Sequence, residues 1–432
     1  MIKKLIVGFT LVFGLTTYAQ QGTASPYSFY NGGDLHFKGT HDVKSMGSLA
    51  VYQDSIRVNL LNPASNANLQ GANLSLGLST SMTKFVSEEN NVNVNRTTFD
   101  YLSLAFPAGK FGFSLGVAPH SFVGYDILNE AQENEFTVRK NYLGEGGINR
   151  AFVGIAYKIT DRLNIGLETR YNFGQTENSI VKFIVDDGHG LSLDRGTREF
   201  IDNRYSGMSF NAGFNYVQPI KDKVKLNIGV TYSPEAKINN EQDITLSTIE
   251  LTDDLAFAEI DAFEQPTLEK KFLLPSKYSI GAGIGDPNKW FTGIEFTGTQ
   301  SSKINAYNSY TNASYKDGYK IAAGGFYTPD HMSITNYMNR VTYRFGARYE
   351  NTGFVLNQQE IKDYAVSAGV SLPVGARAQT PGGIVSMSNL NIGIEYGQRG
   401  TNAHGLIKEN YFNVSLGLSF NDFSWFVKRK FY

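Results

Sequence analysis

Alternation of apolar and polar residues, repeated in one segment after another, is the feature that most constrains the fold of this chain. In "LNIGLETRY" (163–171) every odd-numbered residue is apolar or threonine, and every even-numbered residue is polar, charged or glycine. The segments "LNIGVTY" (226–232) and "FNVSLGLSF" (412–420) repeat the pattern. A soluble sandwich also alternates, but its strands usually have about 5–6 residues. Many segments here keep the pattern for about 9–11 residues, the length of a tilted transmembrane strand.

The first residues have the organisation of a secretory signal peptide. Lys3 and Lys4 precede an apolar stretch from Leu5 to Leu15, and the small-residue pattern ending at Ala19 follows it. Such a segment is removed on export, so we leave 1–19 out of the fold; the alternative is that it forms a buried first strand. The chain has no cysteine. An exported protein without disulfides needs a large closed sheet or core for stability.

The bulk composition agrees with an outer-membrane barrel. No apolar run after the signal approaches the roughly 18 residues of a membrane helix, and barrels conceal their hydrophobicity because only alternate residues face lipid. The formal net charge is −1, which argues against a nucleic-acid partner, because such proteins carry a basic face. We predict an all-β, closed antiparallel transmembrane barrel in the outer membrane of a Gram-negative cell.

Turn residues predict the topology. Short connectors such as "PAGK" (107–110) and "GDPNK" (285–289) alternate with longer polar loops such as 123–148 and 174–205, the arrangement of periplasmic turns and extracellular loops in such barrels. The segment 135–143 would make the strand count odd, so we assign it to an extracellular loop. About 14 strands are expected, near 71–84, 97–107, 110–122, 149–159, 161–173, 205–218, 222–234, 274–285, 289–299, 317–327, 339–350, 361–373, 388–398 and 410–420.

The sequence resembles the FadL-type outer-membrane channels for long-chain fatty acids and other hydrophobic molecules. Asn62, Pro63 and Ala64 match the family's Asn-Pro-Ala motif, and "LPSKYSIGAGIGDPNKWFTGIEF" (274–296) is similar to one of its strand pairs. The resemblance implies a 14-stranded barrel with an N-terminal hatch in the lumen. The segment "NYMNRVTYRFGARYENTG" and the C-terminal end look more like a Bacteroidota branch, in which relatives serve as subunits of secretion or assembly machines.

The domain organisation follows from these features. We expect a signal peptide at 1–19, a hatch at 20–70, the barrel at 71–420 and a periplasmic tail at 421–432. Fourteen strands enclose a lumen wider than side chains fill, since eight strands already suffice for a packed interior. Pro63 fixes φ and restricts Asn62, so this motif predicts a rigid turn inside the plug. The alternative is a periplasmic arm without contact to the lumen.

Pro119 lies inside the third expected strand, with His120 beside it. Proline cannot donate a ladder hydrogen bond, and a closed barrel has no free edge. The resemblance implies a lateral opening toward lipid at a kink in this strand, which Pro119 and His120 would mark. The alternative is that Pro119 ends the strand at the rim.

Charged residues fall on the inward-facing positions of the expected strands. Buried charges are tolerable when they pair or meet water, and a selectivity ring would have one predominant sign. The signs here are mixed, so we favour a network that pins the plug over a selectivity ring. The residues are Glu168, Arg170, Glu295, Arg344, Arg348 and Glu395.

Two further segments are candidate binding regions. In the loop 235–270, Ile249, Ala256, Ile260 and Phe263 have helical spacing; they predict an outer ligand groove, by resemblance, or a helix packed on the rim. The tail after Phe420 carries aromatic and basic residues, and exposed apolar surface of that kind favours docking on a partner over a solvated tail. The tail residues concerned are Trp425, Phe426, Lys428, Arg429 and Lys430.

Neither catalysis nor metal binding is predicted. The six histidines have no zinc spacing, "VDDGHG" (185–190) lacks the ligand spacing of a calcium loop, and the chain has no nucleophile elbow. No cofactor is expected. The leading function is passive uptake of a hydrophobic, fatty-acid-like small molecule or a detergent-like lipid, and outer-membrane lipid is the other expected contact. The alternative is a non-conducting accessory barrel of an outer-membrane secretion or assembly complex, with outer-membrane or periplasmic protein partners.

Overall fold

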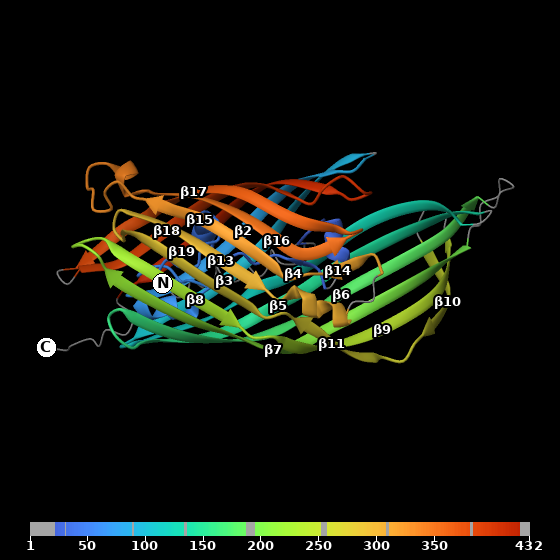
Figure 1. Ribbon diagram of the computed structural model, residues 1–432, viewed down its shortest axis with the longest axis horizontal. Coiled ribbons are helices and arrows are strands. Elements are labelled where there is room, and N and C mark those ends of the chain that lie inside the picture. The colour runs from blue at the N-terminus through green and yellow to red at the C-terminus, as the bar shows by residue number, and fades with distance from the viewer. Residues whose placement is uncertain are drawn as a thin grey trace.

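The chain forms a closed antiparallel barrel, which confirms the predicted fold class (Figure 1). The computed structural model describes residues 22–30, 32–88, 90–133, 136–186, 195–251, 257–307, 311–380 and 383–423. Strand β19 pairs with β2 from Lys408–Val86 to Asp422–Ala72, and this pairing closes the ring. The 14 wall strands are β2 (Ala72–Val86), β3 (Asn91–Ala108), β4 (Phe111–Glu133), β5 (Phe136–Lys158), β6 (Leu163–Asp186), β7 (Arg195–Pro219), β8 (Lys225–Ser233), β12 (Lys277–Asp286), β13 (Trp290–Thr299), β15 (Gly318–Tyr327), β16 (Thr342–Leu356), β17 (Gln359–Thr380), β18 (Gly383–Arg399) and β19 (Lys408–Asp422).

The polarity of the wall is the reverse of a soluble core. On β6, Ile165 is 42% exposed and Leu167 49%, whereas Asn164 is 2% exposed and Glu168 3%. The same contrast holds on the other wall strands, where exposed aliphatic and aromatic residues alternate with buried polar ones. Apolar side chains therefore point outward, as the lipid-facing band of an outer-membrane barrel requires, and the polar side chains line the lumen.

The strands differ in length on the two sides of the barrel. β8, β12, β13 and β15 have 9–10 residues, whereas β4 to β7 have 23–25 and extend far beyond the ring at the right of Figure 1. The prediction that 123–148 and 174–205 are loops is wrong, because most of their described residues belong to β4, β5, β6 and β7. The described part of 135–143 is likewise strand, since β5 begins at Phe136. It lengthens a hairpin without adding a crossing, so the strand number is unchanged.

The predicted helix within 235–270 is also wrong. Its residues form β9 (Ala236–Leu251) and β10 (Phe257–Glu264), which pair with each other, and β11 (Leu268–Leu274), which returns along β9. Pro234 separates β8 from β9 and Pro275 separates β11 from β12 at the same level, because proline cannot donate to the ladder. The ladder pairing of β9 and β7 favours extended backbone over the helical spacing.

The N-terminal segment, defined here as residues 22–70, lies against the inward-facing residues of the wall. It contains η2 (Pro26–Phe29), β1 (Asp34–Leu35), α2 (His41–Lys44) and η3 (Pro63–Asn68). Leu49 and Val51 pack with Phe291 and Ala322 of the wall, and Val58 and Leu60 belong to a cluster with Tyr101. The barrel interior is therefore occupied by a compact segment without long secondary structure.

Smaller elements complete the described part of the chain. They are η4 (Ser301–Tyr307), β14 (Ala313–Tyr315) and η5 (Tyr337–Arg340). No helix in the described residues has the length and apolar character needed to cross a membrane. The predicted signal peptide 1–19 lies outside the described residues, and so do Trp425, Phe426, Lys428, Arg429 and Lys430. The final described strand, β19, includes Asn421 and Asp422, which were assigned to the tail.

Candidate luminal binding site

The Asn62–Pro63–Ala64 motif begins the 3₁₀-helix η3. The Asn62 side chain accepts a hydrogen bond from the Ala64 amide at 3.1 Å, which caps the helix, and Pro63 occupies its first turn. The side-chain oxygen of Asn59 accepts from the amides of Leu61 and Asn62 at 3.0 and 3.1 Å. This local network satisfies the backbone donors of a turn that has no sheet partner.

Wall glycines allow η3 to approach the barrel closely. A Cβ at Gly166 would lie 2.5 Å from the Ala64 amide nitrogen, and one at Gly213 would lie 2.2 Å from the Asn62 side-chain oxygen. A Cβ at Gly112 would lie 2.1 Å from the Asn66 carbonyl oxygen. The three glycines belong to β6, β7 and β4, so small residues on both sides make this contact possible.

Strand β4 leaves β3 next to Pro119. The pairing of β3 with β4 runs from Ala108–Phe111 to Leu102–Val117, although both strands continue further toward their outer ends. A register shift at His120 follows in the pairing of β4 with β5. Beyond it, β1 of the N-terminal segment pairs with β4, and the His36 amide donates to the His120 carbonyl at 3.1 Å. The N-terminal segment thus pairs with β4 beyond the end of its ladder with β3.

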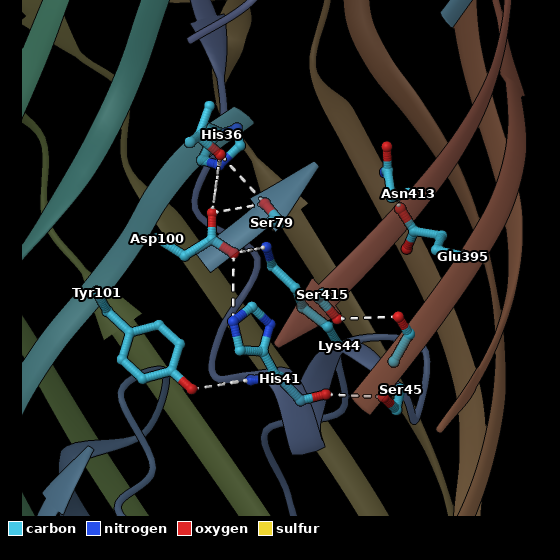
Figure 2. Close-up of polar contacts among 12 residues, drawn as sticks. His36, His41, Lys44, Ser45, Ser79, Asp100, Tyr101, Glu395, Asn413 and Ser415 are labelled. Atoms are coloured by element: carbon cyan, nitrogen blue, oxygen red, sulfur yellow. Dashed lines mark hydrogen bonds and ion pairs between the residues drawn. The ribbon is translucent and has the colours of Figure 1, made fainter. Parts of the chain in front are cut away.

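A buried carboxylate holds the adjoining part of the N-terminal segment (Figure 2). Asp100 of β3 is 1% exposed; the Lys44 ammonium donates to it at 2.9 Å, and His36 Nε2 lies 2.8 Å from its other oxygen. The Ser79 hydroxyl donates to the same carboxylate at 2.9 Å. A buried charge with this set of partners is stabilised by pairing and hydrogen bonds.

His41 lies directly beneath this cluster in α2. Its side chain is fully buried, its amide donates to the Tyr101 hydroxyl at 3.3 Å, and its Nε2 lies 3.5 Å from the Asp100 carboxylate (Figure 2). Burial, and to a smaller extent the neighbouring Lys44 charge, lowers the pKa of the His41 imidazole to about 3. The imidazole is therefore neutral at physiological pH.

The predicted luminal charges occur mainly in close contacts. Arg170 donates to Glu168 at 2.6 Å, Arg348 contacts Glu395 and Asp363, and Arg344 donates to the Ser371 hydroxyl. Two further contacts join luminal carboxylates of the wall to the N-terminal segment. The Ala50 amide donates to Glu295 at 2.8 Å, and the Lys38 ammonium lies 3.4 Å from Asp363.

A cavity of about 320 Å³ lies between the N-terminal segment and the wall. Toward the outer end its lining is apolar, and this cluster includes Tyr27, Leu273, Ile304 and Phe354. From β11 into β12, toward the other end of the barrel, the lining becomes polar and charged. That part contains the cations Arg150, Arg170 and Lys277, the hydroxyls of Ser279 and Thr297, and the carboxylates Glu295 and Glu350. The cavity therefore has one apolar end and one charged end.

The remaining predicted residues do not form one site. Ile249 is buried on β9, whereas Ile260 and Phe263 are exposed on β10, so they do not share a helical face. Ala256 lies outside the described residues, and ligand capture by the exposed pair stays a prediction. Part of "VDDGHG" is also outside them, and the described residues contain no group of three or more metal-ligating side chains.

Sequence reasoning missed several residues of the lumen, notably Asp100, His41, Arg150 and Lys277. Asp100 is the extra residue of a bulge, because Phe99 and Tyr101 pair with consecutive residues of β2. The spacing of three between Phe99 and Leu102 was a signal of this bulge, since strict alternation requires an even spacing. Arg150 and Lys277 lie near the first residues of the expected strands 149–159 and 274–285. At a strand end, alternation alone does not define which residues face inward.

The comparisons with known proteins agree with the barrel. The BamG family matches residues 1–432. Curated proteins yield no match. The structure is similar to the CymD monoaromatic hydrocarbon channel (TM-score 0.57, 14% identity, 90% of this chain and 98% of that one). It is equally similar to the toluene transporter TodX of P. putida and to a FadL homologue of Pseudomonas aeruginosa (each TM-score 0.57, 14% identity, 90% of this chain and 99% of the other). At this identity the likeness establishes the fold.

Proposed function

The chain belongs to the BamG family, and we propose that it is an outer-membrane channel for passive uptake of hydrophobic small molecules. The observation that carries the proposal is the end of the β3–β4 ladder at Leu102–Val117, with β1 of the N-terminal segment beyond it. The cavity beside this position is partly lined by apolar side chains and is large enough for a small ligand. A molecule in this cavity reaches lipid where the β3–β4 ladder ends, once β1 moves away from β4.

The path begins at the apolar end of the cavity and leaves near Pro119 and His120. The N-terminal segment acts as a hatch, with Asn62, Pro63 and Ala64 fixing its base against the wall glycines. Displacement of β1 from Ser121 and Phe122 opens the exit. The concentration gradient and transfer from water to apolar surroundings drive the movement. Fatty-acid-like molecules are the ligand class that the sequence resemblance adds.

An uptake assay in intact Gram-negative cells tests this function. The outer membrane slows the entry of N-phenyl-1-naphthylamine, whose fluorescence rises in an apolar environment. Cells that produce the protein are compared with cells carrying an empty vector, and surface exposure of the barrel is checked by protease accessibility. We expect faster probe entry in the producing cells. Equal rates at equal barrel content contradict the channel function.

A second candidate is a non-conducting accessory barrel of an outer-membrane secretion or assembly complex, as in the Bacteroidota branch that the sequence resembles. The lumen supplies the observation that favours it: Arg348, Asp363 and Glu395 fill part of the interior with an ion-pair network instead of an apolar path. Extraction in a mild detergent separates the two candidates. Stoichiometric protein partners without bound lipid favour the accessory barrel, whereas a solitary barrel with a bound hydrophobic molecule favours the channel.

A further inference from the structure

We propose that the polar end of the luminal cavity is a binding site for a phosphate group, formed by Arg150, Arg170 and Lys277. These residues belong to β5, β6 and β12, and all three line the same cavity. Their charges lie close enough to repel one another. Repulsion among buried cations is unfavourable unless anions join them, so this arrangement is suited to a negatively charged ligand.

Two of the three cations have no carboxylate partner. Among the ion pairs of the described residues, Arg170 pairs with Glu168, but Arg150 and Lys277 appear in none. Arg150 contacts the ring of His120, a weak partner for a guanidinium, and its buried Nε has no hydrogen-bond partner. Four cations (Arg150, Arg170, Lys277 and Lys320) face three carboxylates (Glu168, Glu295 and Glu350) in this region, so a net positive charge remains.

Two of the carboxylates that line the cavity, Asp34 and Asp363, form ion pairs with other arginines. Asp34 binds Arg399 at 2.6 Å, Asp363 lies 3.3 Å from Arg348, and Glu295 accepts the Ala50 amide. Glu350 is the cross-strand partner of Lys320, another cation of the lining, and it also faces Lys277. The net positive charge near Arg150 and Lys277 favours an anionic group such as a phosphate monoester, which carries about −1.5 to −2 near pH 7.

Hydroxyl groups next to the cations add hydrogen-bond donors. Ser279 and Thr297 are register partners on β12 and β13, two residues along from Lys277 and its partner Thr299. Thr297 is 3% exposed, and its buried hydroxyl has no hydrogen-bond partner. A phosphate has three strong acceptor oxygens, and arginine binds such oxygens in pairs. A carboxylate offers two oxygens and one charge, so it satisfies this donor set less completely.

The phosphate has two sources, a soluble phosphate ester or inorganic ion and the headgroup of an amphiphile. The apolar cluster at the outer end of the cavity could accommodate the chain of an amphiphile. Inorganic phosphate, dihexanoyl phosphatidic acid and hexanoate are therefore the three probes for the site. This inference concerns binding and does not rest on passage through the wall, so a failed uptake assay leaves it standing.

Titration calorimetry on the full-length barrel in a nonionic detergent at pH 7.5 is the test. We expect inorganic phosphate and phosphatidic acid to bind and hexanoate to bind at least tenfold more weakly than phosphatidic acid. Tighter binding of phosphatidic acid than of inorganic phosphate identifies a headgroup, and the reverse order identifies a soluble phosphate. Arg150→Gln and Lys277→Gln should each weaken binding about tenfold or more, because each removes a charge-assisted contact.

Matched variants separate the site from general charge and folding effects. Lys225→Gln removes an exposed cation at the other end of the neighbouring strand β8 and should leave binding unchanged. Arg150→Lys keeps the charge and should bind within a few-fold of the wild type. Heat-modifiable gel mobility confirms that each variant is a folded barrel. Unchanged phosphate affinity in folded Arg150→Gln and Lys277→Gln overturns the proposal, as does hexanoate binding as tight as phosphatidic acid.

Discussion

The backbone amide of Ala50 donates a hydrogen bond to the carboxylate of Glu295 at 2.8 Å. Ala50 belongs to the N-terminal segment and Glu295 to β13, and both are buried. The contact joins an irregular segment to the inner wall through a charge-assisted hydrogen bond. It gives a direct way to measure how firmly the segment is held.

Glu295→Leu should loosen the segment around Ala50. A hydrogen bond to a charged group contributes about 1.5–3 kcal/mol, and the buried Ala50 amide would lose its acceptor. Hydrogen–deuterium exchange of that amide should accelerate about 10- to 100-fold, since about 1.4 kcal/mol corresponds to a factor of ten. Glu295→Gln keeps an acceptor oxygen of the same shape and should have a smaller effect. Wild-type exchange in Glu295→Leu would show that the contact does not hold the segment.

Gly213→Ala should destabilise the attachment of η3. The new Cβ would meet the Asn62 side-chain oxygen at 2.2 Å and the Ala64 amide at 2.9 Å, and overpacking of this kind costs about 1–3 kcal/mol. Limited proteolysis of the N-terminal segment should become faster. Gly154→Ala is the matched control, because its closest neighbour is the rotatable Ser114 hydroxyl. Equal proteolysis of both variants would contradict the tight contact.

The N-terminal segment should loosen as the pH falls below about 6.5. Free histidine has a pKa of about 6.5, and burial lowers that of His41 to about 3. The released segment therefore binds a proton that the packed one excludes, so stability is present above pH 6.5 and declines as the pH falls toward 3. Lys44, Asp100 and His36 face His41 and modulate the effect.

Hydrogen exchange of amides 42–48 measures this dependence, after correction for the intrinsic pH dependence of exchange. Local opening should become more favourable between pH 7 and pH 5 in the wild type. His41→Gln, which cannot be protonated, should flatten the change over the same range. If the wild type and His41→Gln respond to pH equally, another group controls the opening.

Alternation was sufficient to predict the barrel and the number of crossings. It works because lipid and lumen impose opposite requirements on neighbouring residues, as Ile165 and Asn164 illustrate. It failed for the extensions of β4 to β7, where polar composition resembles that of a loop but ladder pairing continues. Helical spacing likewise misassigned 249–263, because long-range pairing with β7 and within the hairpin outweighs a local pattern.

Part of the candidate site was accessible from sequence and part was not. Asn62, Pro63 and Pro119 carry local backbone constraints, so a turn and an interrupted strand could be inferred from them. The proximity of Arg150, Arg170 and Lys277 depends on the pairing of β12 with β8, which follows the excursion of β9 to β11 and places β12 on the same side of the wall as β5 and β6. No short-range pattern encodes that juxtaposition. The bulge at Asp100 disrupted the inward register that would have placed its carboxylate in the lumen.

A reversible cross-link between the N-terminal segment and β4 tests the central claim, that displacement of β1 opens the wall. Leu35 and Ser121 are register partners, and the chain has no cysteine of its own. Cross-strand Cα atoms lie about 4.5–5.5 Å apart, within the range of a disulfide. The control pair, Ser75→Cys with Ser419→Cys, joins β2 to β19 where the ladder is continuous.

The measurement is the rate at which N-phenyl-1-naphthylamine enters cells that produce the Leu35→Cys/Ser121→Cys variant, before and after reduction. We predict that the oxidised variant admits the probe no faster than cells without the protein, that reduction restores wild-type entry, and that the control pair has no effect. Probe entry at the wild-type rate in the fully oxidised variant would contradict the account.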